Sequence, residues 1–317
     1  MRLITAVNQY IAYCRSLGEH FKSNDKMLNA FVHAIGKRTA LIDVDPESIG
    51  KYLAGTTPII TRYWHNKYWV LRGFYRYAIS RGYTAISPLP VVTPKRPPPF
   101  IPYIYKVEEL RALFDACFDY QKNKGRFDPY MLRTLLLLLY GAGLRISEAI
   151  ALTLADVDLS QAVLTIRETK FYKTRLVPLG KYLAESLLEY VQWRRKAKYP
   201  QNLDAPFFIG RNEKAVNQRT VEYAFQIIRE KVGIRRDDNP HHQPRLHDLR
   251  HTFAVHRLTA WYKEGADVQR LLPVLSVYLG HSCLSSTSIY LTMTPALLEE
   301  ASHRFEQYAL KKEIFHD

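Results

Sequence analysis

The run Leu135-Leu-Leu-Leu-Leu-Tyr-Gly-Ala-Gly-Leu-Arg-Ile-Ser-Glu148 is the most informative part of this 317-residue chain for its fold. It begins as an apolar stretch that is too short to cross a bilayer and is typical of a helix buried in a protein core. The Gly-Ala-Gly turn at 141–143 ends that helix, and Arg145 follows directly. A rigid core at this point can hold the arginine side chain in a fixed position.

The amino-acid composition indicates a globular protein with an excess of positive charge. A hydrophobic content of 47% is ordinary for a globular protein, and the length is sufficient for two domains. The formal net charge of +15 favours a polyanionic partner, because each contact with a phosphate releases condensed counterions. Charge alone would fit a merely basic protein equally well. The three cysteines are far apart and imply no disulfide framework, which fits a reducing cytoplasm, and no signal peptide is visible.

A proline-rich stretch divides the chain. Residues 88–102 contain seven prolines, which cannot sustain a helix and favour an extended connector. We therefore predict a helical N-terminal domain over 1–92, a proline-rich linker over 93–103 and a C-terminal domain over 104–317. The fold class that we predict is mainly α with a small β-hairpin or sheet.

Within the C-terminal domain, the β-rich runs 163–168 and 174–178 predict the hairpin, because only a short link separates them. Helices are expected to dominate the rest of the domain. Pro273 is expected to open a separate short helix before Gly280, since proline is favoured in the first turn. Residues 295–317 read as a terminal helix with an apolar stripe.

The second half of the N-terminal domain is strongly basic. Residues 51–100 hold eight Lys or Arg and no Asp or Glu. Between Thr61 and Arg81, apolar residues recur at helical spacing, and we expect them to lie in the core: Trp64, Tyr68, Leu71, Tyr75 and Ile79. Basic residues on another side of this helix and in the linker are expected to contact a DNA groove and its phosphates: Arg62, His65, Arg72, Arg76, Lys95 and Arg96.

Several short segments of the C-terminal domain hold residues suited to phosphodiester chemistry. Breaking a DNA backbone requires positive charge around the non-bridging oxygens and a proton for the leaving 5′-oxygen. Arginine suits the first task because its planar fork donates two parallel hydrogen bonds to one phosphate. Tyr290, nine residues after His281, supplies a phenol as nucleophile. Because carboxylates are not gathered in any segment, we expect metal-free chemistry with no cofactor.

These segments resemble the signature boxes of the tyrosine recombinase, or phage integrase, family. The boxes are Gly-Ala-Gly-Leu-Arg-Ile-Ser-Glu at 141–148, His-Asp-Leu-Arg at 247–250, Leu-Gly-His at 279–281 and Tyr290, in matching order and spacing. The segment 169–180 is similar to the family's lysine-bearing β-hairpin. The resemblance covers the C-terminal domain as the catalytic domain. More loosely, the N-terminal domain looks like the family's helical core-binding domain.

The resemblance implies how the phosphate would be handled. Arg145 and Arg250 would clamp the scissile phosphate, and His281 would donate to one of its oxygens. Tyr290 would attack the phosphorus, leaving a 3′-phosphotyrosyl bond and a free 5′-hydroxyl. Because that bond keeps the energy of the broken phosphodiester, rejoining would need neither ATP nor a metal.

The resemblance also implies how protons would move. Lys170 would protonate the departing 5′-oxygen, and His247 would assist proton transfer at the nucleophile. Lys173 is a rival for the acid role and a candidate DNA contact. Glu148 would orient neighbouring groups.

The expected partner is double-stranded DNA, with a homotetramer acting on two duplexes, no membrane and a cytoplasmic, nucleoid-associated location. Accessory DNA-bending proteins or a partner recombinase are further candidates. The terminal helix at 295–317 would pack into a neighbouring subunit or, alternatively, on its own domain. The expected outcome is integration, excision or transposition of a mobile element. A type IB topoisomerase and a catalytically silent DNA-binding regulator remain as alternatives.

Overall fold

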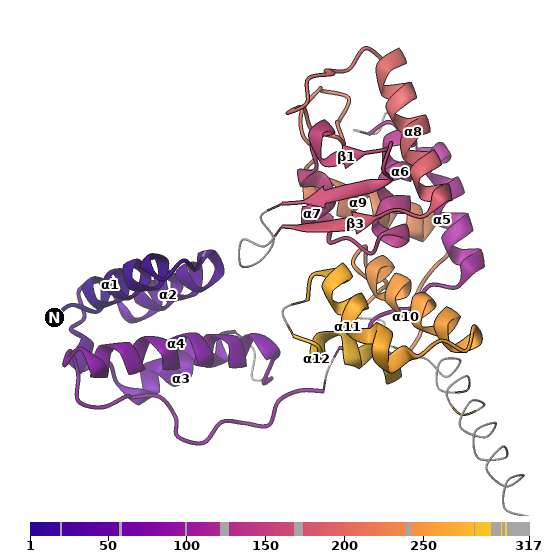
Figure 1. Cartoon of the computed structure of the whole chain (residues 1–317). Coiled ribbons are helices and arrows are strands. Elements are labelled where there is room, and N and C mark those ends of the chain that lie inside the picture. The colour runs from indigo at the N-terminus through magenta and orange to yellow at the C-terminus, as the bar shows by residue number, and fades with distance from the viewer. Residues whose placement is uncertain are drawn as a thin grey trace, which may run out of the picture. The chain divides into compact units, whose positions relative to one another are not determined.

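The computed structural model describes residues 1–19, 21–56, 59–98, 100–120, 127–167, 174–238, 242–281 and 283–292, together with 299 and 302. The chain divides into two compact units, Met1–Phe100 and Ile101–Asp317, which we call the N-terminal unit and the C-terminal unit (Figure 1). The division falls inside the proline-rich segment.

The N-terminal unit is helical. Its elements are α1 (Leu3–Ser16), α2 (Lys22–Ile35), η1 (Leu41–Asp43), α3 (Pro46–Ala54) and α4 (Arg62–Ser80). Side-chain caps define where two of the helices begin: Asp45 accepts a hydrogen bond from the backbone N–H of Ser48 at 2.8 Å, and Thr61 accepts one from Trp64 at 3.2 Å. Helix α4 packs against α1, α2 and α3, so it is covered on several sides.

The apolar stripe predicted for α4 is confirmed at four positions, which are Trp64, Tyr68, Leu71 and Tyr75. It is wrong at Ile79, which is 40% exposed. The last turn of α4 buries Ala78 instead, because a repeat of 3.6 residues moves the buried face back by one position after several turns.

The C-terminal unit is mainly helical with one small sheet, which confirms the predicted fold class. Its elements are α5 (Val107–Asp119), α6 (Pro129–Gly141), α7 (Ile146–Ala151), η3 (Leu154–Asp156), β1 (Val157–Asp158), β2 (Val163–Ile166), β3 (Arg175–Pro178), α8 (Lys181–Lys196), α9 (Gln218–Lys231), α10 (Asp248–Lys263), α11 (Val268–Leu279), α12 (Ser285–Ser288) and η4 (Ile289–Thr292). The predicted terminal helix at 295–317 lies outside the described residues, apart from 299 and 302. In the described part of the chain, no helix is both long enough and apolar enough to span a membrane.

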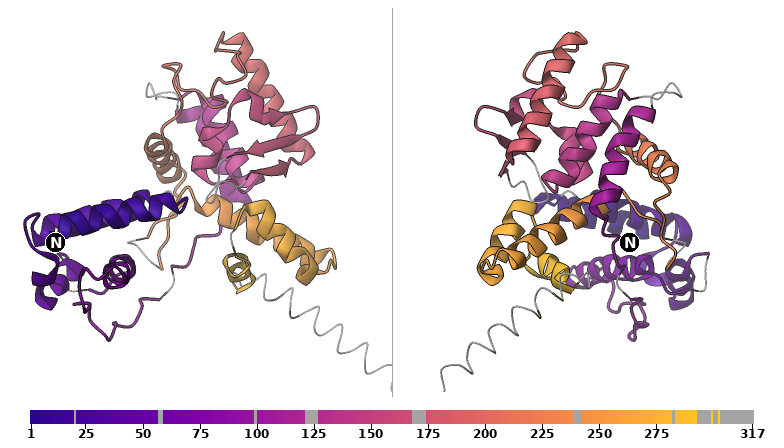
Figure 2. Two further views of the ribbon diagram at one scale, coloured as in Figure 1. Left: turned by 60° about the vertical axis from the view of Figure 1, so that its left-hand side comes forward. Right: turned by 90° about the vertical axis from the view of Figure 1, so that its right-hand side faces the viewer.

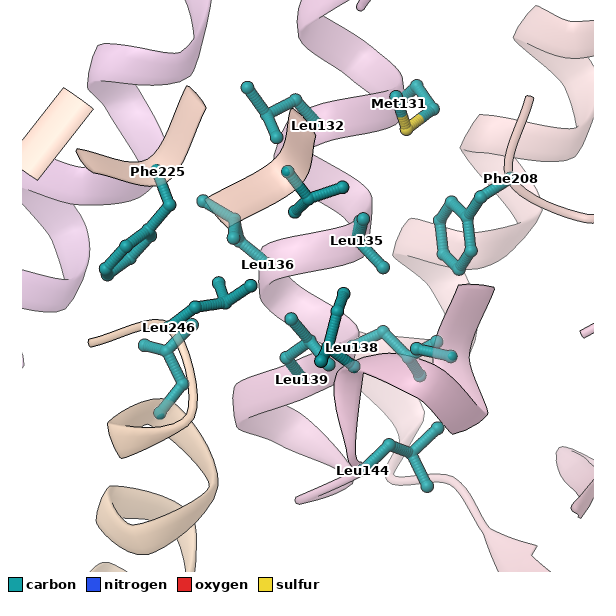
Figure 3. Packing of buried hydrophobic residues seen from close by; sticks show 14 of the residues in the cluster. Met131, Leu132, Leu135, Leu136, Leu138, Leu139, Leu144, Phe208, Phe225 and Leu246 are labelled. Atoms are coloured by element: carbon teal, nitrogen blue, oxygen red, sulfur yellow. The ribbon is translucent and has the colours of Figure 1, made fainter. Parts of the chain in front are cut away.

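Helix α6 forms the centre of the larger core. Its leucines point in different directions: Leu135 lies toward Phe208, and Leu136 lies toward Phe225 and Leu246 (Figure 3). Fully burying one leucine side chain stabilises the folded state by about 1.5–3 kcal/mol. Packing on several sides therefore holds α6 firmly, and with it the glycine turn at its end.

The predicted hairpin is confirmed by the antiparallel pairing of β2 with β3, in which Leu164 lies opposite Val177. Both of these side chains are buried in the core around α6. A third strand, β1, pairs with the other edge of β2. It escaped prediction because two residues are too short to show a period of two.

Helices α10 and α11 lie at one end of the C-terminal unit, coloured orange to yellow in Figure 2. The prediction that Pro273 opens a separate helix is wrong, because α11 begins at Val268 and continues through the proline. Asp267 caps its start by accepting a hydrogen bond from the backbone N–H of Arg270. The proline removes one backbone hydrogen bond from the helix. Burial of Leu272 and Leu275, on either side of the proline in the sequence, holds the helix together.

Candidate catalytic site

Segments that are far apart in the sequence meet at the end of α6. They are the turn between α6 and α7, the first turns of α10, the end of α11 with His281, and η4. Hydrogen bonds between them span 107, 29 and 39 residues. The site is therefore assembled by the packing of the C-terminal unit and not by any local motif.

Arg250 is the most deeply buried cation of this site. It lies in the first turn of α10 with 2% of its surface exposed. Its Nη1 donates to the carbonyl of Gly143 at 2.7 Å, and its Nη2 donates to the carbonyl of Leu279 at 2.6 Å. Burial and the nearby charge of Arg145 lower the pKa of Arg250 to about 10, so it is still charged at neutral pH. Two carbonyls thus hold a fixed positive charge in the core.

Gly143 can be replaced by no other residue without strain. Its φ of +59° lies in the left-handed region, and a Cβ at this position would lie 2.4 Å from Cδ1 of Phe253. The second glycine of the Gly-x-Gly turn is therefore required for two reasons, backbone conformation and close packing against α10. The same residue supplies one of the carbonyls that hold Arg250.

We expect Gly143→Ala to lower the free energy of unfolding by about 2–4 kcal/mol, because the left-handed conformation and the overlap with Phe253 add their costs. The measurement is urea denaturation followed by circular dichroism. Gly233→Ala is the matched control, since its φ is +72° but nothing lies within 4 Å of the new Cβ. Equal losses for the two variants would contradict the packing argument.

Glu148 connects three guanidinium groups. It accepts hydrogen bonds from Nη1 of Arg145 at 2.7 Å and from Nη2 of Arg175 at 2.8 Å, and it lies 4.0 Å from Nη1 of Arg250. Burial alone would raise the pKa of Glu148, but the hydrogen bonds and charge of Arg175 and the hydrogen bonds of Arg145 lower it to about 2. The carboxylate therefore stays ionised and orients the cluster.

Arg145 is the most open of these cations. Its side chain is 31% exposed, against 9% for that of Arg175. It precedes α7 and donates from Nη2 to the carbonyl of Gly280 at 3.0 Å. A cleft of about 760 Å³ between α7, η3 and β2 is lined by Arg145 and Glu148. An anion in that cleft could reach the arginine from solvent.

Arg175 belongs to this cluster although no role was predicted for it from the sequence. It begins β3 and donates from Nε to the carbonyl of Tyr278 at 2.9 Å, in addition to its bonds to Glu148. Its position in the hairpin motif was the one feature of the sequence that could have indicated a role for Arg175 in the site. A basic residue at the start of a strand is ordinarily at the surface, so only the packing of α11 on β3 reveals the contact.

Tyr290 is enclosed in the same region. It is 1% exposed, and its hydroxyl lies 3.0 Å from Nδ1 of His251. Burial raises the pKa of Tyr290, and the charges of Arg250 and Arg145 act in the opposite direction. The ring of His281 lies 6.2 Å from the Tyr290 ring, and its Nδ1 is 2.7 Å from the hydroxyl of Thr287. The structure therefore brings the phenol together with Arg145, Arg250 and His281.

Three histidines lie in this region. His247 is exposed, whereas His251 and His281 are half-buried. Removal from water lowers the pKa of His251 and that of His281 to about 4, and neighbouring positive charges, including that of Arg250, act in the same direction. Both of these half-buried imidazoles are therefore neutral at neutral pH.

These histidines predict that the free protein loses stability in mild acid. Below pH 6.5 the unfolded chain binds protons that the folded chain does not, so stability falls from about pH 6.5 toward pH 4. Solvent still screens these two half-buried imidazoles, so we expect a combined loss on the order of 1–2 kcal/mol. Thermal unfolding measured across this window checks the expectation. His281→Asn should flatten the dependence and the exposed His33→Asn should leave it unchanged; the opposite result would contradict the assignment.

Two predicted site residues, Lys170 and Lys173, lie outside the described residues. Among the residues that the structure does describe, no group of three or more His, Cys, Asp or Glu is gathered as metal ligands would be. The structure thus describes the other residues predicted for the catalytic site: Arg145, Glu148, His247, Arg250, His281 and Tyr290.

The predicted DNA contacts of the N-terminal unit differ in whether their side chains are exposed. Five are exposed: Arg62, Arg72, Arg76, Lys95 and Arg96. Arg72 and Arg96 lie over the ring of Trp69, which is 46% exposed. His65 was predicted to lie on the exposed basic side of the helix, but this placement is wrong, since the residue is only 6% exposed. Because α4 is covered by three other helices, its buried face is wider than the stripe that the sequence predicts and includes His65.

Comparisons with known proteins agree with this arrangement. Residues 105–296 match the phage integrase family. A protein of Sinorhizobium fredii named putative integrase/recombinase y4rB is 32% identical over 95% of this chain and 96% of its own length. The tyrosine recombinase XerC of Pediococcus pentosaceus is 28% identical over 96% of this chain and 98% of its own. A solved lambda integrase dimer bound to a COC′ core site has the same fold, with a TM-score of 0.68 and 16% identity over 92% of this chain and 78% of that one.

Proposed function

Because this chain belongs to the phage integrase family of tyrosine recombinases, we propose that it cuts and rejoins DNA at specific sites through a covalent bond to Tyr290. The observation that carries the proposal is the burial of Tyr290 close to Arg145 and Arg250, whose positive charges act on its phenol. A phenol held in that position can attack an anion that the two arginines neutralise.

The arginines fit the charge that develops during the reaction. When the phenolic oxygen attacks phosphorus, the five-coordinate transition state carries more negative charge on its non-bridging oxygens than the ground state does. Arg250 is held by two backbone carbonyls and Arg145 by Glu148, so neither has to reorganise at that moment. The ring of His281 lies 6.2 Å from the Tyr290 ring, and His281 would donate to the phosphate.

The leaving group requires a proton. As the bond between phosphorus and the 5′-oxygen breaks, its electron pair stays on that oxygen, which would take a proton from Lys170 or from its rival Lys173. Rejoining is the reverse: the 5′-hydroxyl attacks the phosphotyrosyl bond and releases Tyr290. No ATP is consumed, because the energy of the phosphodiester is retained in the covalent intermediate.

The remaining features suggest how DNA would be held. The exposed cations of the N-terminal unit, Arg62, Arg72, Arg76, Lys95 and Arg96, would contact phosphates. We further propose a tetramer on two duplexes, with residues 295–317 exchanged between subunits and accessory proteins as additional partners. Integration, excision or transposition of a mobile element at the nucleoid would be the outcome.

The proposal is tested by covalent trapping. The DNA that flanks the encoding gene is searched for repeated or inverted sites, and these are synthesised with a nick that prevents rejoining. We expect a denaturation-resistant protein–DNA adduct that forms in the presence of EDTA and without ATP. Failure to form an adduct on any DNA that the protein binds would contradict the proposal. Relaxation of plasmids without such a site would instead indicate a topoisomerase.

A further inference from the structure

His251 is the basic group that lies directly on the candidate nucleophile. Its Nδ1 is 3.0 Å from the hydroxyl oxygen of Tyr290, and the two rings are 5.6 Å apart. The residues come from α10 and η4, which pack against each other. Because Tyr290 is 1% exposed, solvent has little access to its hydroxyl. The proton of the phenol therefore faces an imidazole and not bulk water.

We propose that His251 removes the proton from Tyr290 as the phenol attacks the scissile phosphate, a role that rests on the proposed function. The proton passes to Nδ1 of His251 while the phenolic oxygen forms its bond to phosphorus. The bond from phosphorus to the 5′-oxygen breaks, and that oxygen takes a separate proton from Lys170 or Lys173. During rejoining, His251 returns its proton to Tyr290.

The charges around His251 keep it ready to accept. Burial and the positive charges of Arg245 and Arg250 lower the pKa of His251 to about 4, and His281 adds to this effect. A neutral imidazole with its hydrogen on Nε2 offers the lone pair of Nδ1 to the phenol. A bound phosphate offsets the arginine charges and so raises the pKa of His251 toward the range in which a general base works best.

The geometry favours His251 over His247 for this proton. His247 is exposed and immediately precedes α10, and its ring lies 4.9 Å from the His251 ring in an edge-on arrangement. It faces the imidazole of His251, whereas the hydrogen bond of Tyr290 is made with His251 itself. The position one residue beyond the His-x-x-Arg motif thus reaches the nucleophile, because α10 presents His247 and His251 one turn apart.

The test uses two substitutions of His251 in the full chain. The side-chain oxygen of asparagine lies close to where Nδ1 lies, so His251→Asn keeps an acceptor for the phenol but cannot take its proton at neutral pH. His251→Ala removes both functions. We expect His251→Asn to slow single-turnover adduct formation on nicked DNA by about 100-fold or more. Its rate should rise with pH beyond the plateau of the original protein, because ionisation of Tyr290 then replaces the base.

A second substrate separates this proton from that of the leaving group. If the 5′-bridging oxygen is replaced by sulfur, the thiolate leaves without a proton. We expect whichever of Lys170→Ala and Lys173→Ala is slow on ordinary DNA to recover on this substrate, and His251→Asn to stay slow. The exposed His33→Asn is the control, with thermal unfolding and DNA binding measured for every variant.

Two results would overturn the role of His251. One is a rate for His251→Asn within about threefold of the original protein at every pH, which would mean that a hydrogen-bond acceptor suffices. The other is recovery of His251→Asn on the sulfur substrate, which would place its proton on the leaving group. If the original protein forms no adduct at all, the proposed function fails and the role of His251 fails with it.

Discussion

Tyr290→Phe is expected to abolish the covalent protein–DNA adduct while leaving DNA binding and the fold intact. The substitution removes the nucleophilic oxygen, and no other group can replace it in the bond to phosphorus. The ring still fills the same space, so the loss is confined to the contacts of the hydroxyl, of which the hydrogen bond to His251 contributes about 0.5–1.5 kcal/mol. Adduct formation on nicked DNA and binding by gel shift are measured on the same preparations.

Tyr190→Phe provides the matched control. Tyr190 is also 1% exposed, and its hydroxyl donates to the carbonyl of Phe207 at 3.2 Å in the core around α6. It therefore loses a comparable hydrogen bond outside the candidate site and should keep its adduct. An adduct that persists in Tyr290→Phe would show that another residue attacks the phosphate, and the proposed mechanism would have to be abandoned.

Arg250→Ala is expected to slow cleavage by about 1000-fold or more, because the transition state loses its most enclosed positive charge. The loss has a structural part, since the carbonyls of Gly143 and Leu279 lose their donor. Arg250→Lys separates the two parts. It restores the charge, but a single ammonium group cannot reproduce the planar fork that contacts two carbonyls and a phosphate together. Single-turnover rates at saturating DNA provide the measurement.

Arg194→Lys is the control for the loss of stability that follows when a buried arginine is replaced by lysine. Arg194 is fully buried and donates to the carbonyl of Pro206 at 3.0 Å, outside the candidate site. This variant should lose stability without losing cleavage per folded molecule. If Arg250→Lys and Arg194→Lys show the same cleavage rate, Arg250 acts in folding alone and its place in the mechanism is refuted.

Local features of this protein can be predicted from its sequence. The apolar run before Gly141 indicates a buried helix, and the β-rich runs 163–168 and 174–178, separated by a short link, indicate a hairpin. His247 immediately precedes α10 and Arg250 lies in its first turn, so their spacing of three residues places them on one face. Such features depend on interactions between residues near each other in the chain, which is why periodicity and turn residues reveal them.

Contacts between distant segments required the folded chain. The bond between Arg175 and Glu148 and the approach of His251 to Tyr290 join residues that are 27 and 39 positions apart. His65 and Pro273 were misplaced because the number of helices covering α4, and the burial that sustains α11 across a proline, depend on their neighbours. Sequence motifs thus identify the residues of the candidate site, while helix packing determines which of them touch, because side-chain contacts across a core have no local period.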